Sequence, residues 1–380
     1  MVDHDRNGWF LAGLPGRRKG LAIACAYLML LVFGRAYGQD LIEEPLRIPM
    51  PEAGKAGLEA VVVRPNDAAA HPLALLTHGT PRQATDRAEV SAAQFVPQAR
   101  EFARRGWTTV VVVRRNYGSS GGRYAEETDS CSNHGNYYYA ARESAHDLRA
   151  AISYLSTLPI VDSSRIIAVG VSAGGFAVVA LTADPPPGLK AAISFAGGRG
   201  SRGPDDVCSP DLLVSTFGAL GEKSRIPMLW VYAQNDHFFG PRLAERLYGA
   251  FTRAGGQARF IKAAEFGRDG HGLYSAGGIA IWTPMVDDFL AAQNLKLRDD
   301  LLALPTPPNV TPPESLSTSG LEAFRTFLTY PGHKAFAVSP DGHYGYVIAR
   351  RSNKDAQKKA EEHCKEAAPK SERCVVAVSD

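Results

Sequence analysis

A serine flanked by glycines is the residue of this chain best placed to do chemistry. The segment 170–174, Gly-Val-Ser-Ala-Gly, follows the apolar run 166–169, and small and apolar residues come after it. A β-branched run that ends at glycine indicates a buried strand, and the residues after it are typical of a closely packed helix. This strand, tight turn and helix predict a sharp corner that presents the Ser172 hydroxyl above a sheet as a nucleophile.

A second segment fits the same G-x-S-x-G pattern and serves as an internal control. Residues 118–122 also follow a strand-like run, at 109–113, but a polar and charged stretch comes after them. Because no helix is expected there, we interpret that segment as a loop. For Ser172 the alternatives are a glycine-rich turn or a loop that cradles a phosphate.

A serine hydroxyl needs a base to take its proton, and the base needs a third group to orient it. The expected chain order is serine, acid, histidine. Asp236 follows a predicted strand at 228–233, and His271 lies between two glycines after the last strand of the predicted sheet. We therefore assign Ser172 as nucleophile, His271 as general base and then acid, and Asp236 as its orienting partner. The alternatives are a surface-loop role for His271 and a helix-cap role for Asp236 before Pro241.

An acyl-transfer reaction also needs fixed donors for the oxyanion of its tetrahedral intermediate. The backbone N–H of Ala173, directly after the nucleophile, is one expected donor. The other is expected from the backbone N–H of Thr80, in the turn that follows a predicted strand at 72–77. His78 and Gly79 are expected to shape that turn, and we assign no catalytic role to His78.

The elements that must position these residues alternate along the chain. Strands are predicted at 58–63, 72–77, 109–113, 166–169, 189–195, 228–233 and 258–262, and helices at 92–105, 140–158, 241–254 and 277–292. Such alternation predicts a mostly parallel sheet with helices on both faces, here with an antiparallel edge formed by residues 41–65. The long loop 117–139 is expected to be functional.

These motifs together resemble the α/β-hydrolase superfamily over about residues 41–295, and most closely its dienelactone-hydrolase and prolyl-oligopeptidase-like branches. The resemblance is carried by segments 76–80, 116–121, 170–175 and 270–272. It implies the α/β-hydrolase fold and a Ser/Asp/His hydrolase of esters, lactones or short peptides that uses no cofactor. The chain departs from these branches because serine replaces the cysteine nucleophile of dienelactone hydrolases proper, and no propeller domain is present.

The 380 residues divide into four predicted segments. Residues 1–38 are expected to be a signal peptide, 39–300 the α/β-hydrolase domain, 301–320 a proline-rich linker, and 321–380 a small C-terminal α+β module. In that module, strands are predicted at 334–339, 344–350 and 374–378, and a Lys- and Glu-rich helix at 353–367. A core of this size is marginal on its own.

The N-terminus has the pattern of a secretory signal peptide. Basic residues 17–19 precede an apolar run at 21–33, and small residues at 36–38 predict cleavage before Gln39. The run is shorter than the roughly 20 residues that span a bilayer. We expect export to the periplasm or secretion, with no stable membrane span after cleavage. A transmembrane anchor and a lipoprotein signal at Cys25 are the alternatives.

Four cysteines remain after the predicted cleavage, which suits an oxidising compartment. Three pairings of Cys131, Cys208, Cys364 and Cys374 are possible. We expect Cys364 to pair with Cys374, its near neighbour, and Cys131 with Cys208, since both lie in loops expected at one end of the sheet. A metal site is not expected, because no C-x-x-C spacing occurs.

The sequence therefore predicts an exported serine hydrolase that acts on a small-molecule ester or short peptide. A formal net charge of +3 gives no indication of nucleic-acid binding. A carboxylesterase is the leading expectation, with a serine peptidase or amidase as the alternative. A non-catalytic envelope binding protein on the same fold, and a dinucleotide-binding oxidoreductase, are the other hypotheses considered. The residues leave the oligomeric state open.

Overall fold

An eight-stranded sheet forms the centre of the larger part of the protein. The computed structural model describes residues 40–128, 131, 136–350, 352–369 and 373–380. In spatial order the strands are β1 (Leu41–Ile48), β2 (Leu58–Pro65), β4 (Thr108–Val112), β3 (His71–Thr77), β5 (Val161–Val171), β6 (Leu189–Phe195), β9 (Met228–Ala233) and β10 (Ala258–Ala263). Strand β2 is antiparallel to both of its neighbours, and the other pairs are parallel. The predicted fold class is confirmed.

The central strands are apolar along their whole length because both faces of the sheet are covered. Every residue of β4 and β9 is buried, and β3 is exposed only partly and only at His71. A strand buried on both faces needs a continuous apolar run rather than alternation of polar and apolar residues. For this reason the runs 72–77, 109–113 and 228–233 were identifiable as central strands.

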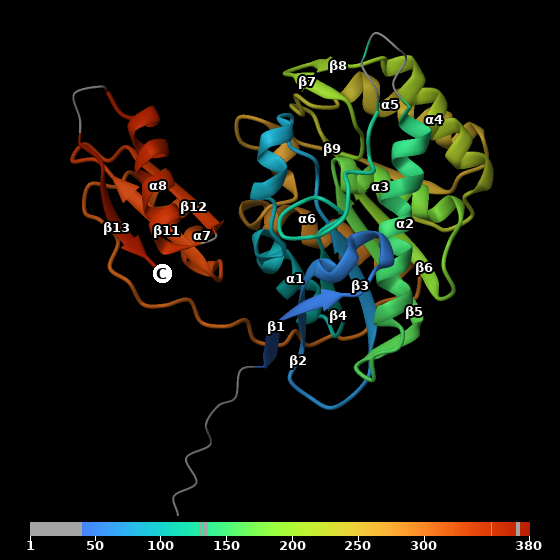
Figure 1. Cartoon of the computed structure of the whole chain (residues 1–380), viewed down its shortest axis with the longest axis horizontal. Coiled ribbons are helices and arrows are strands. Elements are labelled where there is room, and N and C mark those ends of the chain that lie inside the picture. The colour runs from blue at the N-terminus through green and yellow to red at the C-terminus, as the bar shows by residue number, and fades with distance from the viewer. Residues whose placement is uncertain (1–39, 129–130, 132–135, 351, 370–372) are drawn as a thin grey trace, which may run out of the picture. The chain divides into compact units, whose positions relative to one another are not determined.

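Helices cover the two faces of the sheet and form two hydrophobic cores. On one face lie α1 (Val96–Ala103) and α6 (Ile279–Ala292). On the other lie α2 (Tyr137–Leu155), α3 (Ala173–Ala183), α4 (Pro210–Lys223) and α5 (Pro241–Arg253). Figure 1 shows α1 and α2 on opposite sides of β3 and β4. The expectation of helices on both faces is confirmed.

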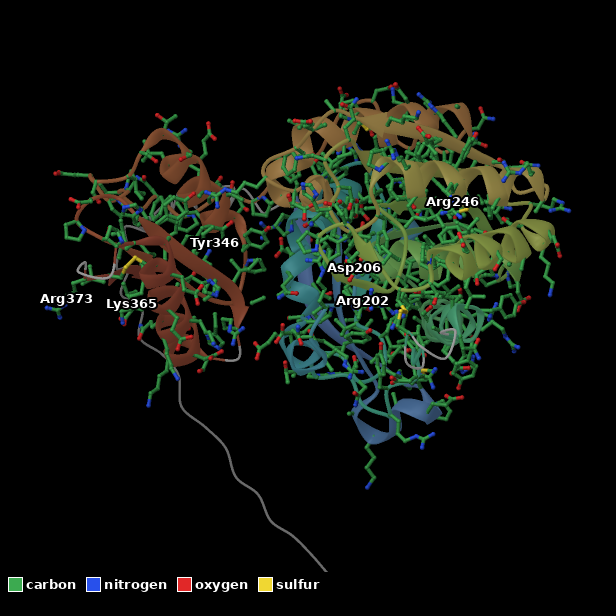
Figure 2. All side chains as sticks on the ribbon, turned by 90° about the horizontal axis from the view of Figure 1, so that it is seen from above. Arg202, Asp206, Arg246, Tyr346, Lys365 and Arg373 are labelled. Carbon is green, nitrogen blue, oxygen red and sulfur yellow. A yellow bond between two sulfur atoms is a disulfide. The ribbon has the colours of Figure 1, made fainter. Side chains whose placement is uncertain are left out.

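The structure differs from the predicted elements at several boundaries. The segment 92–105 begins as a 3-10 turn, Ala92–Phe95, and only then continues as α1. Helix α2 begins three residues before the predicted position 140, because the Asn136 side chain accepts a hydrogen bond of 2.9 Å from the Tyr139 N–H. A short hairpin, β7 (Ser201–Gly203) with β8 (Asp206–Val207), follows β6, and its Arg202 pairs with Asp206 at 2.7 Å (Figure 2).

The C-terminal module contains a three-stranded antiparallel sheet in the order β12 (Tyr344–Arg350), β11 (His333–Val338) and β13 (Val375–Ser379). Helix α8 (Asn353–Ala367) packs on one face of this sheet. Helix α7 (Thr318–Thr329), which we did not predict, supplies Phe324 and Phe327 to an aromatic cluster around Phe336. The α+β character of the module is confirmed, while its exact domain boundaries remain predictions.

Both expected cysteine pairs lie within disulfide range, and Figure 2 shows them as yellow bonds. The Cα atoms of Cys131 and Cys208 are 5.4 Å apart, and those of Cys364 and Cys374 are 6.0 Å apart. The predicted signal peptide, residues 1–38, and its cleavage point lie outside the described residues. Among the described helices, none combines the length and apolar character needed to cross a membrane.

Candidate active site

Ser172 sits at a corner between β5 and α3 in a strained backbone conformation. Its φ is 57° and its ψ is −125°, in a region that residues with a Cβ rarely adopt. The glycines around it are required by close packing. A Cβ at Gly170 would collide with the carbonyl of Gly174, and a Cβ at Gly174 would collide with the carbonyl of His78. The strand, corner and helix thus have the geometry of a nucleophile elbow.

His271 and Asp236 are brought together from the loops that follow β10 and β9. The His271 Nδ1 atom lies 3.1 Å from Asp236 Oδ2 and 3.2 Å from Oδ1. The Asp236 carboxylate is buried, and its Oδ1 also accepts hydrogen bonds from the backbone N–H groups of Phe238, at 2.7 Å, and Phe239, at 2.9 Å. Asp236 therefore lies within hydrogen-bond distance of the imidazole and also holds its own turn. It does not cap α5, whose N-cap residue is Gly240.

Ser172 and His271 line the same pocket, which has a volume of about 400 Å³. A second pocket, of about 220 Å³, also includes Ser172, together with Ala173 and Thr80. Within the described part of the chain, the Ser172 Oγ atom makes no hydrogen bond, and this includes the bond to His271 that a catalytic triad requires. The hydroxyl is accessible from both pockets. Bonds between nucleophile and base are often loose in the absence of substrate.

An aromatic ring holds the imidazole from one side. The Phe238 ring stacks on the His271 ring with centroids 3.9 Å apart and an interplanar angle of 12°. The guanidinium carbon of Arg82 lies 3.5 Å from the centroid of the same Phe238 ring.

His237, which precedes Phe238 in the chain, pairs with Asp205 at 3.0 Å and not with Asp236. Asp269 accepts hydrogen bonds from the backbone N–H groups of His237 and His271, which fixes both loops.

The two predicted oxyanion donors come from segments that pass beside the nucleophile. Ala173 is the first residue of α3, where backbone N–H groups have no partner within the helix. Thr80 follows β3, and the turn before it passes so close to the nucleophile that a Cβ at Gly79 would lie 2.9 Å from Ser172 Cβ. Both residues line the 220 Å³ pocket with Ser172.

His78 is buried inside this turn and both of its ring nitrogens have partners. Its Nδ1 donates to the Gly79 carbonyl at 2.6 Å, and its Nε2 accepts from the Arg114 backbone N–H at 3.0 Å. Burial, together with the nearby charge of Arg114, lowers the pKa of His78 well below its ordinary value. The neutral His78 ring links the turn to the backbone of Arg114. This structural role agrees with our assigning no catalytic role to His78.

Sequence reasoning missed a cluster of three buried charges beside the site. The carboxylate of Glu126 accepts hydrogen bonds from the guanidinium groups of both Arg114 and Arg199. Burial alone would raise the pKa of Glu126, but the charges of Arg114 and Arg199 outweigh it and lower this pKa to about 2. The only available signals were the positions of the two residues: Glu126 belongs to the long loop 117–139, which was expected to be functional, and Arg199 belongs to the segment 197–203 after β6, which contains four glycines.

No cofactor or metal was expected here. Within the described residues, no group of three or more His, Cys, Asp or Glu side chains is arranged to hold a metal ion. Three arginines, Arg82, Arg87 and Arg199, line the smaller of the two pockets beside Ser172. Its wall is therefore polar and positively charged.

A family model of the X-Pro dipeptidyl-peptidase (S15) family matches residues 54–203. The match includes the elbow at Ser172 and the turn at Thr80, and it ends before Asp236 and His271. The resemblance to the α/β-hydrolase superfamily is thereby confirmed. The match supports a hydrolase of the esterase or S15 peptidase type. It does not decide whether the bond that is cleaved is an ester or a peptide bond.

Solved structures that are similar to the chain include three hydrolases. A protein assigned as a dienelactone hydrolase from Klebsiella pneumoniae is 18% identical, with a TM-score of 0.48, over 66% of this chain and 98% of its own. Esterase 2 of Thermogutta terrifontis, phosphorylated by paraoxon, is 17% identical, with a TM-score of 0.48, over 68% and 96%. An esterase of Pyrococcus furiosus is 12% identical, with a TM-score of 0.46, over 67% and 90%. Among curated proteins, no sequence matches the chain.

Proposed function

We propose that this protein is an exported serine hydrolase that cleaves a carboxylic ester through Ser172, His271 and Asp236. The observation that carries the proposal is the pairing of His271 with the buried Asp236 in the pocket where the strained Ser172 is presented. A hydroxyl, an imidazole and a carboxylate in this order are the requirements for nucleophilic acyl transfer.

The reaction would proceed in two halves. In the first, Ser172 Oγ attacks the ester carbonyl while His271 Nε2 takes the hydroxyl proton, and the N–H groups of Ala173 and Thr80 stabilise the oxyanion. Collapse of this intermediate expels the alcohol, which receives the proton from His271 and leaves an acyl group on Ser172. In the second half, His271 activates a water that releases the acid. Asp236 holds the Nδ1–H side of the ring throughout.

A peptidase is the second candidate, because the matching family model is that of X-Pro dipeptidyl-peptidases. An enzyme that removes dipeptides must accept the free ammonium group of its substrate. Among the described residues, three arginines and one acidic side chain, Glu127, line the 220 Å³ pocket beside Ser172 and Ala173. The 400 Å³ pocket that contains both Ser172 and His271 has two carboxylates, Asp86 and Glu89, and one guanidinium group, Arg82, along its wall. The two pockets therefore differ in charge, and the comparison of ester with anilide turnover has to decide between the two substrate classes.

The direct test is hydrolysis of p-nitrophenyl esters of increasing acyl length beside aminoacyl p-nitroanilides, with protein beginning at Gln39 and its Ser172→Ala variant. We expect ester turnover that falls to the background rate in the variant, and labelling of Ser172 by a fluorophosphonate. Faster anilide than ester turnover would favour the peptidase. Folded protein that neither turns over a substrate nor is labelled would contradict a serine hydrolase and leave the binding-protein hypothesis.

Export is proposed from the N-terminal pattern, and two cysteine pairs within disulfide range support it. N-terminal sequencing of the protein recovered from outside the cytoplasm is expected to begin at Gln39. An N-terminus at Met1 in that fraction would contradict cleavage of the signal peptide.

A further inference from the structure

Side chains from two other segments hold the turn that carries Thr80. Arg114, which follows β4, donates from Nη1 to Thr77 Oγ1 at 2.8 Å and to the His78 carbonyl at 2.7 Å. Arg199, which follows β6, donates from Nη1 to Thr80 Oγ1 at 3.4 Å. The turn is therefore tied at its first, second and last residues by two guanidinium groups.

A relay of hydroxyl groups completes the link at Thr80. Thr80 Oγ1 lies 2.7 Å from the Tyr117 hydroxyl, which in turn donates to Glu126 Oε2 at 3.0 Å. Since the Tyr117 proton points to Glu126, the Thr80 hydroxyl donates to Tyr117 and accepts from Arg199. Each hydroxyl then has a defined direction, and the Thr80 side chain has one preferred rotamer.

Glu126 is the common partner of this arrangement. Its Oε2 lies 2.8 Å from Arg199 Nη1 and 3.3 Å from Arg114 Nη2, and its side chain is only 2% exposed. Two guanidinium groups and one carboxylate leave one net positive charge buried behind the turn. Buried ion clusters are frequently no more stable than apolar packing of the same volume, so stability alone does not account for three charges here.

We propose that Glu126 is a positioning residue that, through Arg114, Arg199 and Tyr117, sets the turn at Thr80 for oxyanion binding. The inference rests on the proposed function, because it assumes that the Thr80 N–H contacts the oxyanion. In Glu126→Gln the negative charge is removed and one accepting oxygen becomes an NH2 group, so two guanidinium groups and the Tyr117 hydroxyl compete for one neutral acceptor. The turn then shifts relative to Ser172, and the shift weakens binding of the transition state more than binding of the substrate.

The chain offers a matched control for the loss of a buried carboxylate. Glu101 on α1 is 4% exposed and also faces two arginines, with Arg105 at 2.6 Å and Arg104 at 3.5 Å. Its hydrogen bonds and ion pairs within the described residues go to Arg104 and Arg105 and not to the Thr80 turn. A purely structural role for Glu126 predicts that Glu126→Gln and Glu101→Gln have the same effect on catalysis after correction for the fraction of folded protein.

The experiment compares these two variants with wild type in ester hydrolysis and in binding of a trifluoromethyl ketone, which forms a tetrahedral adduct with a serine. For Glu126→Gln we expect kcat and affinity for the ketone to fall together by roughly 10- to 100-fold, with KM within about threefold of wild type. For Glu101→Gln we expect both to remain at the wild-type value. A folded Glu126→Gln variant with unchanged kcat, or with reduced kcat but unchanged ketone affinity, overturns the proposal.

A second pair of variants keeps the proposal testable if Glu126→Gln does not fold. Thr80→Val removes the hydroxyl that Arg199 and Tyr117 hold and keeps the shape of the side chain, whereas Thr80→Ser keeps the hydroxyl. We expect kcat to fall in the Val variant and to recover in the Ser variant. Equal kcat in both variants would contradict the proposal.

The Ser172→Ala variant separates this inference from the proposed function. Wild-type turnover that is lost in Ser172→Ala establishes the hydrolase, and the Glu126 and Thr80 variants then decide the positioning role alone. If wild type neither hydrolyses the esters nor binds the ketone, the proposed function fails and the inference fails with it.

Discussion

Ser172 keeps a backbone conformation that works against the stability of the fold. A positive φ of 57° costs a residue with a Cβ on the order of 1–3 kcal/mol, and the Ser172 hydroxyl makes no compensating hydrogen bond within the described residues. The surrounding glycines and the helix α3 hold the residue in place. Strained residues of this kind are found mainly at functional sites, because a strained conformation with no structural benefit would otherwise be lost.

We therefore expect Ser172→Gly to be more stable than Ser172→Ala by about 1 kcal/mol, although both are inactive. Glycine adopts positive φ without strain, and this gain exceeds the extra freedom of glycine in the unfolded chain. Urea unfolding of the two variants measures the difference. A glycine variant less stable than the alanine variant would show that the corner is not strained.

Glu126 is expected to make part of the stability pH-dependent. Its pKa is about 2 in the folded protein and near 4.5 when unfolded, so the folded state favours the ionised form. The contribution is present in full above about pH 5 and is lost as the pH falls through 4.5 toward 2, with a total on the order of 3 kcal/mol. Unfolding free energies of wild type and Glu126→Gln should therefore converge on acidification, and a constant difference would contradict this assignment.

Individual residues of the site were predictable where a local pattern identifies them. The glycines around Ser172, the strand before Asp236 and the glycines around His271 are all readable within a few positions. Glu126 was not, because its partners Arg114 and Arg199 are 12 and 73 positions away and only the fold brings them together. A buried charge cluster has no local signature.

At the scale of elements, three loops at one edge of the sheet combine to hold the imidazole. Arg82 lies after β3, Phe238 after β9 and His271 after β10, and the stacked Phe238 ring is shared by the other two. The carboxyl ends of parallel strands meet at this edge, so loops distant in sequence become neighbours. An aromatic ring in this position restricts rotation of the His271 imidazole.

Phe238→Ala is expected to lower kcat/KM by about tenfold, since a stacked pair contributes up to about 1.5 kcal/mol and the freed imidazole samples unproductive rotamers. Phe238→Tyr keeps the ring and is the matched control, with activity close to wild type. Ester hydrolysis at saturating and low substrate separates kcat from KM. Activity of the alanine variant equal to that of the tyrosine variant would remove any role for the stacking.

The elements that sequence reasoning found and missed differ in a physical way. Strands β6 and β9 coincide with their predicted ranges because β9 is a continuous apolar run, β6 is largely apolar apart from Lys190 and Ser194, and turns bound both. Helix α4 was missed because glycine is usually a helix breaker, yet Gly221 is needed there: a Cβ at this position would collide with the backbone of Phe251 on α5. In a single sequence, a glycine that allows two helices to pack closely cannot be distinguished from a glycine that ends a helix.

At the scale of the whole molecule, the two cysteine pairs constrain very different lengths of chain. Cys131 and Cys208 are 77 positions apart, whereas Cys364 and Cys374 are 10 positions apart. The pairing was predictable because the alternation of strands and helices places both long loops at one end of the sheet. Each bridge lowers the conformational entropy of the unfolded chain, and this effect grows with the number of residues in the loop that the bridge closes.

Replacing both Cys131 and Cys208 by serine is expected to lower the free energy of unfolding by about 4 kcal/mol, and the same change at Cys364 and Cys374 by about 3 kcal/mol. Denaturant unfolding of the two double variants under oxidising conditions measures both values. The first variant should also lose ester hydrolysis, because its bridge joins the loops that carry Glu126 and Arg199. The second should keep it, and loss of activity in the second variant alone would contradict this division.

The longer bridge also changes what a protease can do to the molecule. The covalent ring closed by Cys131 and Cys208 contains α2, β5, Ser172, α3, β6 and Arg199. A single cut anywhere between residues 131 and 208 opens the backbone but leaves the two fragments joined through sulfur. Ser172 therefore stays attached to the segment that carries Asp236 and His271. The fragments of a cut molecule separate only when the disulfide is also reduced.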